Sequence, residues 1–346
     1  MINVFYFKRI SKIGGCESWF YYLSRLYKNM TIYYREGDPE QIKRLAKNVE
    51  VRQYHDGDTI KCDNFFCCYN PDIIDYVDAK EYISVIHCDY KNVWFSPIIN
   101  LKFTKYIAVS KIAGESFKEL TGLDYELLYN PVAIDIPKVE KYNDGKLHLI
   151  SATRLTREKG LERIKKLAEL LDKNNIDYIW EIYTNRPRQI IGKNVIYKEP
   201  KFDIIPEIAK ADYLVQLSDC EAFCYSVVES LMVGTPIIAT NLPVLQELGV
   251  RDQKEGFILD FSMKNIPLDQ IIQKPLKIAY KPPKNEWDKY LDNNTSYNPD
   301  KLVKVRFRRG IWLIEENTRT IKGQELDIKQ YRASELECKG LVERCN

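Results

Sequence analysis

The sequence lacks the features that would assign it to a function class at once. Its 346 residues carry a net charge of only +3, because 52 Lys and Arg are nearly balanced by 49 Asp and Glu. A protein that binds nucleic acid usually carries a basic face. The two signs are interspersed here, so no nucleic acid partner is expected.

The nine cysteines lack the spacing of a zinc site. No C-x-x-C pair occurs among them, although Cys67 and Cys68 are adjacent. Small buried thiols in a reducing compartment are therefore the simpler interpretation.

The amino terminus lacks a long apolar run. The segment MINVFYFKRI reaches Lys8 after seven residues. This is shorter than the apolar region of a signal peptide or a membrane-spanning helix. We therefore expect a cytoplasmic protein.

What the sequence does contain is an alternation of strand-like and helix-like segments, which favours parallel sheets covered by helices. The expected strands are 3–8, 31–34, 65–69, 82–87, 106–110, 147–153, 178–184, 213–218 and 236–240. The expected helices are 17–28, 39–47, 111–121, 161–172, 204–209, 226–232 and 243–248.

The alternation stops once, in a polar stretch rich in Pro and Asn at 129–146, which reads as a linker. The sequence therefore predicts an α/β protein of two tandem Rossmann-like domains with a small appended α+β C-terminal unit. The predicted divisions are 1–135, 145–275, 276–299 as a crossover helix and linker, and 300–346 as the appended unit.

In such a fold, ligands collect at the carboxyl ends of strands, where helix N-termini point N–H groups toward anions. The first such place is KIGGCES, where Gly14 and Gly15 let the backbone approach a phosphate. It is not G-x-G-x-x-G, and no acidic residue ends the second strand, so a nicotinamide cofactor is not expected. A tight turn without a ligand is the alternative.

A second place is SATRLTREKGLERI, at the start of the second domain. Arg154 stands just past a strand and Lys159 just before the helix that Gly160 opens. Two cations at one corner can neutralise a departing diphosphate. A solvated loop is the alternative.

The third place is SDCEAFCYSVVESLMVGTPIIAT. Cys224, Tyr225 and Ser226 open an apolar helix, where their amides suit a phosphate, and the carboxylates of Glu221 and Glu229 suit the hydroxyls of a sugar. Ser226 and Glu229 also have the S-x-x-E spacing of a capping box, which is the structural alternative for Glu229.

Taken together, these segments resemble the retaining glycosyltransferases of the GT-B fold, the family 4 group. Glu221 and Glu229 form its E-x7-E signature. The segments GGCE, YIAVSKIAGESFKELTG, LLYNPV and LISATRLTREKGLERI follow in the family's order, so that the resemblance covers 1–292.

The resemblance implies a nucleotide-diphosphate-sugar donor, with UDP or GDP as the nucleotide and no cofactor, bound between the domains and mostly on the second. Arg154 and Lys159 would hold the diphosphate, and Glu229 the ribose. Catalysis would then be mainly charge stabilisation of the leaving diphosphate, without a protein nucleophile.

Three further roles follow from the same resemblance. Glu221 would hold the hydroxyls of the donor sugar, and His87, which ends YISVIH, would lie over the reacting sugar. The amides of 224–226 and 14–15 would complete the phosphate site.

The sequence also departs from the family. It has E-A-F-C where the family has E-G-F-G, so either the loop is displaced or Cys224 faces away. Asp56–Asp58 imitates the D-x-D of metal-using glycosyltransferases, but in a polar turn outside the predicted cleft, so no metal is expected. A GT-B isomerase or phosphorylase, and a sugar-binding tether without catalysis, stay open as alternatives.

The acceptor is left open among glycans, lipids, proteins and small molecules. The basic helix 39–48 offers a contact with an anionic membrane, with a solvated face as the alternative. The tail is weakly similar to modules of bacteriophage structural proteins. That similarity implies that the tail docks on a partner protein. For an enzyme encoded by a phage, it implies a location in the host cytoplasm.

Overall fold

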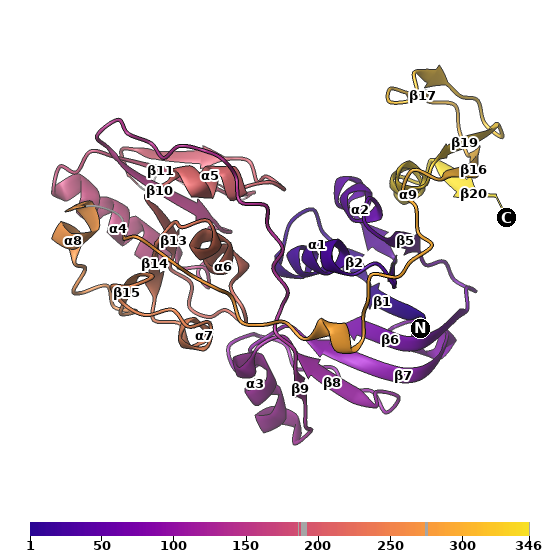
Figure 1. Ribbon diagram of the computed structural model, residues 1–346, viewed down its shortest axis with the longest axis horizontal. Coiled ribbons are helices and arrows are strands. Elements are labelled where there is room, and N and C mark those ends of the chain that lie inside the picture. Colours follow the sequence, from indigo (N-terminus) through magenta and orange to yellow (C-terminus); the bar gives the residue numbers. More distant parts are fainter. Residues whose placement is uncertain (186, 188–191, 274–275, 346) are drawn as a thin grey trace.

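The computed structural model describes residues 1–185, 187, 192–273 and 276–345. Two parallel sheets lie side by side, and a small third unit projects from the N-terminal one (Figure 1). The predicted division at 275 and the last residue of the predicted tail unit, 346, lie outside the described residues.

The N-terminal domain is a seven-stranded parallel sheet in the order β5-β3-β1-β6-β7-β8-β9. Its strands are β1 (Asn3–Phe7), β3 (Met30–Tyr34), β5 (Glu50–Gln53), β6 (Ile60–Cys68), β7 (Val77–Ile86), β8 (Lys105–Ala108) and β9 (Glu126–Leu127), with β2 (Arg9–Ile10) and β4 (Glu36–Gly37) forming a separate pair. Its helices are α1 (Gly15–Leu26), α2 (Pro39–Ala46), α3 (Lys111–Thr121) and the 3-10 turn η1 (Ile74–Tyr76).

Local sequence signals fix where these helices begin and end. Asp38 accepts hydrogen bonds from the amides of Glu40 and Gln41, and Pro39 occupies the first turn of α2. Ser110 caps α3 in the same way, and Gly122 ends that helix in the left-handed conformation that glycine adopts without strain.

The second domain is a six-stranded parallel sheet in the order β12-β11-β10-β13-β14-β15. Its strands are β10 (Leu147–Ala152), β11 (Tyr178–Tyr183), β12 (Val195–Lys198), β13 (Tyr213–Gln216), β14 (Ile237–Thr240) and β15 (Gly256–Leu259). Its helices are α4 (Leu161–Lys173), α5 (Ile205–Lys210), α6 (Tyr225–Met232), α7 (Pro243–Glu247) and α8 (Leu268–Gln273).

After α8 the chain runs back to the N-terminal domain (Figure 1). The crossover helix predicted within 276–299 is wrong, because the described part of that segment holds only the 3-10 turn η2 (Trp287–Lys289). Its anchor is Trp287, which is fully buried against Phe5 and Trp19 of the N-terminal core. One buried indole therefore fixes this segment where a longer helix was expected.

The C-terminal unit is an antiparallel sheet with one helix. It comprises β16 (Leu302–Phe307), β17 (Trp312–Leu313), β18 (Thr318–Arg319), β19 (Glu325–Lys329), α9 (Gln330–Cys338) and β20 (Val342–Arg344), with β19-β16-β20 as the sheet.

This unit covers the edge strand of the N-terminal sheet. The hydroxyl of Ser334 and the guanidinium of Arg344 both donate to the carbonyl oxygen of Val51 in β5, at 3.1 and 3.4 Å. An uncovered edge strand exposes unpaired backbone groups to other chains. The tail therefore protects one edge of the sheet and packs α9 against α2.

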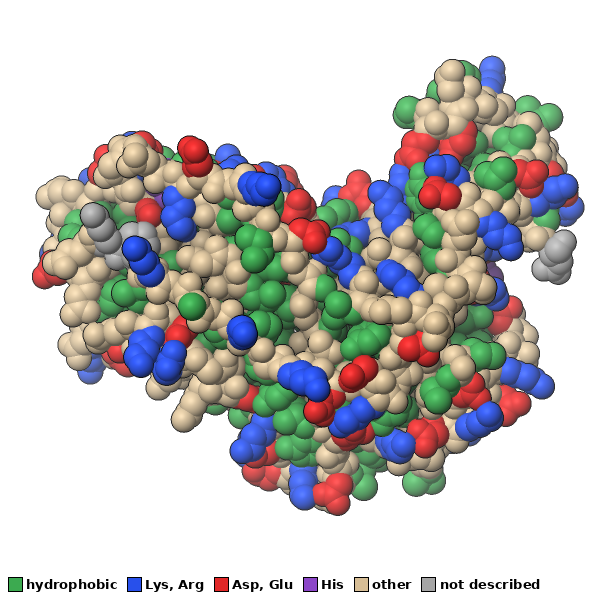
Figure 2. All heavy atoms as spheres, viewed as in Figure 1, with side chains coloured by type: hydrophobic (Ala, Val, Ile, Leu, Met, Phe, Trp, Pro, Cys, Tyr) green, Lys and Arg blue, Asp and Glu red, His purple; other side chains and the backbone are tan. Residues whose placement is uncertain are grey.

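Charges of both signs are interspersed over the face seen in Figure 2, including the projecting C-terminal unit. Within the described ranges, every helix is too short or too polar to cross a bilayer.

Candidate functional site

The loop before α6 is shaped by a residue in an unusual conformation. Cys224 has φ 63° and ψ 68°, a left-handed geometry that costs a non-glycine residue on the order of 1 kcal/mol or more. The family pattern has glycine at this position. The side chain is 7% exposed and packs in the apolar core of the second domain, so the cysteine faces away from the loop surface.

The capping box proposed for Ser226 and Glu229 is wrong. The N-cap of α6 is Cys224, which makes no side-chain cap hydrogen bond, and Ser226 lies inside the helix. Its hydroxyl donates instead to Oε1 of Gln216 at 3.2 Å. Neither side chain is thus held by helix capping.

Glu221 is the centre of a compact polar network. Its Oε1 accepts from Nζ of Lys159 at 2.6 Å, from the hydroxyl of Ser218 at 2.8 Å and from Nε2 of Gln216 at 3.0 Å. Burial disfavours the charged form of Lys159, but the Glu221 carboxylate outweighs it and raises the pKa of the lysine. The ammonium group is therefore charged and held in place.

The position of Lys159 depends on the next residue. Gly160 begins α4 with φ 78°, and a Cβ there would lie 1.8 Å from the carbonyl oxygen of Leu217. Only glycine permits this approach, which brings the loop after β10 against the loop after β13. Arg154, at the same corner, is 55% exposed and lies 3.8 Å from Glu158, so its guanidinium stays accessible to a ligand.

Glu229 is buried, with 8% exposure, and its partner comes from the other domain. Its Oε1 accepts from the hydroxyl of Tyr22 in α1 at 2.6 Å, and the ring of Tyr22 lies 5.5 Å from that of Tyr225. Burial raises the pKa of the Glu229 carboxyl. Tyr22 therefore occupies one oxygen of the carboxylate that was predicted to hold a ribose.

The glycine loop of the first domain contains a carboxylate. Glu17 is buried at the start of α1, and its Oε1 accepts from the amide of Ser11 at 2.7 Å. A Cβ on Gly14 would lie 2.2 Å from Oε2 of Glu17, so a side chain at position 14 would displace that carboxylate. Nothing lies within 4 Å of a Cβ on Gly15. A phosphate at this loop would thus meet a nearby carboxylate.

His87 lies at the end of β7 among aromatic rings and thiols. Its ring is 4.8 Å from that of Trp19 and 6.0 Å from that of Tyr69, and Nε2 is 3.4 Å from Sγ of Cys68. Burial lowers the pKa of His87 to about 3. The imidazole is therefore neutral at physiological pH and acts through hydrogen bonds and contact.

This depressed pKa predicts a pH-dependent stability. The unfolded chain takes up a proton on His87 below its ordinary pKa of 6.5, whereas the folded chain resists protonation until about 3. Lowering the pH from 6.5 to about 5 should therefore remove about 2 kcal/mol from the free energy of unfolding through this residue. Urea denaturation of wild type and His87→Gln at both pH values measures the difference.

Between pH 6.5 and about 5, the free energy of unfolding of His87→Gln should fall less than that of wild type. The matched control is His55→Gln, at an exposed position, which should lose as much as wild type. Equal losses in all three proteins would contradict a neutral His87 in the folded protein.

The structure brings some of the predicted residues together and keeps others apart. Lys159 and Glu221 are in direct contact, and Gln216 joins them to Ser226. Glu229 is engaged separately by Tyr22. Among the described residues no hydrogen bond or ion pair joins Arg154, His87 or the glycine loop to this network, although Arg154 is close enough for its charge to lower the pKa of Lys159.

Sequence reasoning missed Gln216, Ser218 and Tyr22. The first two are buried polar residues at the end of the apolar segment YLVQLS. A buried polar side chain needs a partner, so their presence there was a usable signal. Tyr22 had no such signal, because it lies among other aromatic residues of α1.

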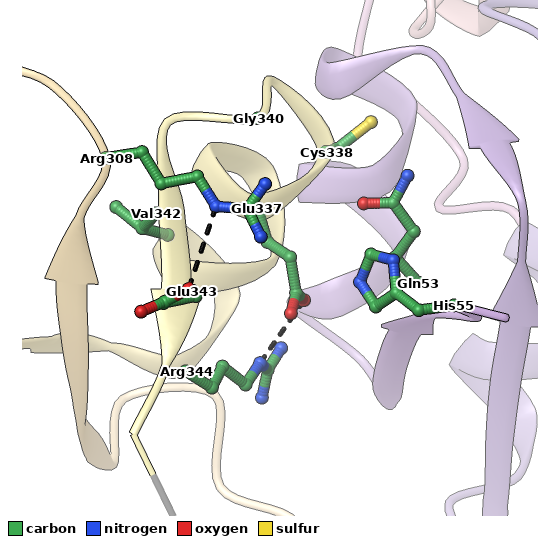
Figure 3. Close-up of a pocket in the computed structure, with 9 residues that line it drawn as sticks. All are labelled: Gln53, His55, Arg308, Glu337, Cys338, Gly340, Val342, Glu343 and Arg344. Atoms are coloured by element: carbon green, nitrogen blue, oxygen red, sulfur yellow. Dashed lines mark hydrogen bonds and ion pairs between the residues drawn. The ribbon is translucent and has the colours of Figure 1, made fainter. Parts of the chain in front are cut away.

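Two cavities among the described residues involve the C-terminal unit. The first has a volume of about 340 Å³ and lies between this unit and the end of β5 (Figure 3). Glu337 is 3.3 Å from Arg344, and Glu343 is 3.9 Å from Arg308, so its charges are paired. Among the described residues no cluster of three or more His, Cys, Asp or Glu could hold a metal ion.

A profile of the family described as "Glycosyl transferases group 1" matches residues 133–277. That range contains Arg154, Lys159, Glu221 and Glu229. No curated protein matches the sequence.

Solved structures resemble the chain over most of its length. Alr3699/HepE of Anabaena, solved in complex with UDP and glucose, has 16% identity and a TM-score of 0.61, over 79% of this chain and 89% of that one. A glycosyltransferase from Rickettsia africae has 13% identity and a TM-score of 0.54, over 75% and 84%.

The lipopolysaccharide outer core galactosyltransferase WaaB, in its apo form, has 15% identity and a TM-score of 0.52, over 79% of this chain and 89% of that one. At such identities the likeness concerns the fold. The predicted α/β fold of two Rossmann-like domains in the GT-B arrangement is confirmed.

Proposed function

We propose that this protein transfers a sugar from a nucleotide-diphosphate-sugar donor to an acceptor, with retention of the anomeric configuration. The observation that carries the proposal is the network of Lys159 and Glu221, which lies within the segment that the glycosyltransferase profile matches. A cation and a carboxylate held 2.6 Å apart at the carboxyl ends of parallel strands suit a ligand with both phosphates and hydroxyls.

In this proposal Lys159 exchanges part of its contact with Glu221 for the donor diphosphate. Arg154 joins it from the exposed side of the same corner. Together they stabilise the charge that develops on the leaving diphosphate. Glu221, still held by Ser218 and Gln216, accepts hydrogen bonds from the sugar through its second oxygen.

Glu229 holds the ribose in this proposal. The domains must then separate enough for Tyr22 to release Oε1, because both the phenol and the carboxylate are buried in the ligand-free protein. UDP is the first nucleotide to test, since the Anabaena structure contains it. GDP is the second.

The experiment is a turnover assay with a panel of UDP- and GDP-sugars. Release of UDP or GDP is followed with and without candidate acceptors, and the product anomer is read by proton NMR. The proposal expects acceptor-dependent release and a product with the donor's anomeric configuration. An inverted product would refute retention, and donor turnover without acceptor would favour an isomerase or a hydrolytic side reaction.

A sugar-binding tether is the second candidate, because Ala222 and Cys224 stand where the family pattern has glycine. Against it, Cys224 keeps a glycine-like conformation with a buried side chain, so the position of its amide does not depend on glycine. Tight donor binding without turnover of any donor in the panel would support the tether over the enzyme.

A further inference from the structure

The connection between β7 and β8 has no regular secondary structure. Adjacent parallel strands are usually joined through a helix that covers the sheet. Residues 87–104, all of them described, form neither helix nor strand. Instead Tyr90 and Phe103 are buried against the sheet, and the ring of Phe95 meets those of Tyr69 and Tyr90. The inner side of this segment thus takes the place of a crossover helix.

The outer side of the same segment is also apolar. We call residues 93–101 the apolar loop. Its outward side chains are Trp94, which is 95% exposed, Leu101, which is fully exposed at 102%, Ile98 and Ile99. No charged residue occurs in the loop, whereas Lys91 and Lys102 flank it. A monomeric protein rarely exposes so many large apolar side chains together, and such a patch marks an interaction surface.

The basic helix 39–48, for which a membrane contact and a solvated face were both considered, has other partners. Lys43 of α2 lies 3.3 Å from Glu335 of the tail, and Lys47 lies over the ring of Tyr331 at 5.8 Å. The guanidinium of Arg44 lies 3.3 Å from the centre of the Tyr21 ring. This helix is therefore engaged within the molecule, and the apolar loop is the better candidate surface.

We propose that the apolar loop inserts into the interfacial region of a bilayer containing anionic lipids. Tryptophan with aliphatic residues is the composition favoured at that depth. Lys91 and Lys102 are 45% and 41% exposed, and their partners Glu119 and Asp75 are more exposed still. The flanking ammonium groups can therefore exchange these surface partners for lipid phosphates.

The loop begins next to the candidate donor site. Sγ of Cys220, adjacent to Glu221, donates to the carbonyl oxygen of Asn92 at 3.6 Å. A docked loop would therefore hold this contact between the domains at the membrane surface. If the proposed function holds, the acceptor is a membrane-borne lipid or lipid-linked glycan.

The test is sedimentation of the full chain with vesicles of phosphatidylcholine and phosphatidylglycerol, without donor. Wild type should co-sediment. The variant Trp94→Ser/Leu101→Ser should have a partition coefficient at least about tenfold lower. Its serines would lose the favourable transfer of two large apolar side chains from water into the bilayer. Lys102→Gln should lower it about fivefold, and added salt should reduce that difference.

The matched control is Ile136→Ser/Ile321→Ser, which alters two exposed apolar residues outside the loop. It should bind vesicles as wild type does, and all variants should keep the wild-type melting temperature. Wild type that stays in the supernatant, or equal losses in control and loop variants, would overturn the proposal. The proposal would also be overturned if the wild type formed a dimer, the loop variant were monomeric, and neither protein bound vesicles.

Titration with UDP separates this proposal from the proposed function. The loop variant should bind UDP with wild-type affinity whether or not it binds vesicles. Wild type that binds vesicles but not UDP would refute the donor site alone. Wild type that binds UDP but not vesicles would refute the membrane role of the apolar loop alone.

Discussion

Replacing Lys159 with alanine should lower kcat/KM for sugar transfer by about 100-fold or more. The ammonium group is largely buried, charged and fixed 2.6 Å from Glu221, so it needs little reorganisation to stabilise a leaving diphosphate. A preorganised charge in a partly dry site contributes more than the same charge in water. Steady-state kinetics with the preferred donor measures the loss.

The control is Lys165→Ala, also in the α4 region, where the lysine pairs with Glu162 at the surface. It should leave kcat/KM within about twofold of wild type, since surface pairs contribute little. Melting temperatures show whether Lys159→Ala is folded. A folded Lys159→Ala with wild-type kcat/KM would remove this lysine from the mechanism.

Replacing Glu229 with alanine should weaken UDP binding by about 10- to 100-fold, because hydrogen bonds to a charged acceptor contribute about 1.5–3 kcal/mol. Glu229→Gln should show a smaller loss, since it keeps the size and one acceptor oxygen but removes the charge. Isothermal titration with UDP and with GDP measures both. The control is Glu169→Gln, at an exposed position of α4, which should bind as wild type does.

Tyr22→Phe distinguishes a ligand role of Glu229 from a structural one. It removes the 2.6 Å hydrogen bond that competes for Oε1 but leaves the carboxylate in place. This variant should bind UDP at least as tightly as wild type. If it loses affinity as Glu229→Ala does, the contact between the domains, rather than a free carboxylate, is what UDP binding requires.

The alternation was predictable where an apolar strand is followed directly by an amphipathic helix, as with β8 and α3 or β10 and α4. Asp38 and Ser110 cap α2 and α3 through their side chains. The strands β5, β12 and β15 were not predicted. Each is an edge strand of its sheet, and pairing with its one neighbouring strand, which no local pattern encodes, is what defines it.

The candidate site was predictable in its residue types but not in its contacts. The loop containing Glu221 and the corner containing Lys159 were each identified, yet their direct contact depends on Gly160 packing against Leu217. The pairing of Glu229 with Tyr22 joins residues 207 positions apart. Such a contact follows from how the two domains face each other, which no local pattern encodes.

The most direct test of the donor site is a crystal structure of the protein with UDP or GDP. The diphosphate should lie against Lys159, Arg154 and the N-terminus of α6, and the ribose hydroxyls should replace Tyr22 on Glu229. Nucleotide density away from the second domain, or a nucleotide bound while Lys159 contacts only Glu221 and Glu229 contacts only Tyr22, would contradict the assignment.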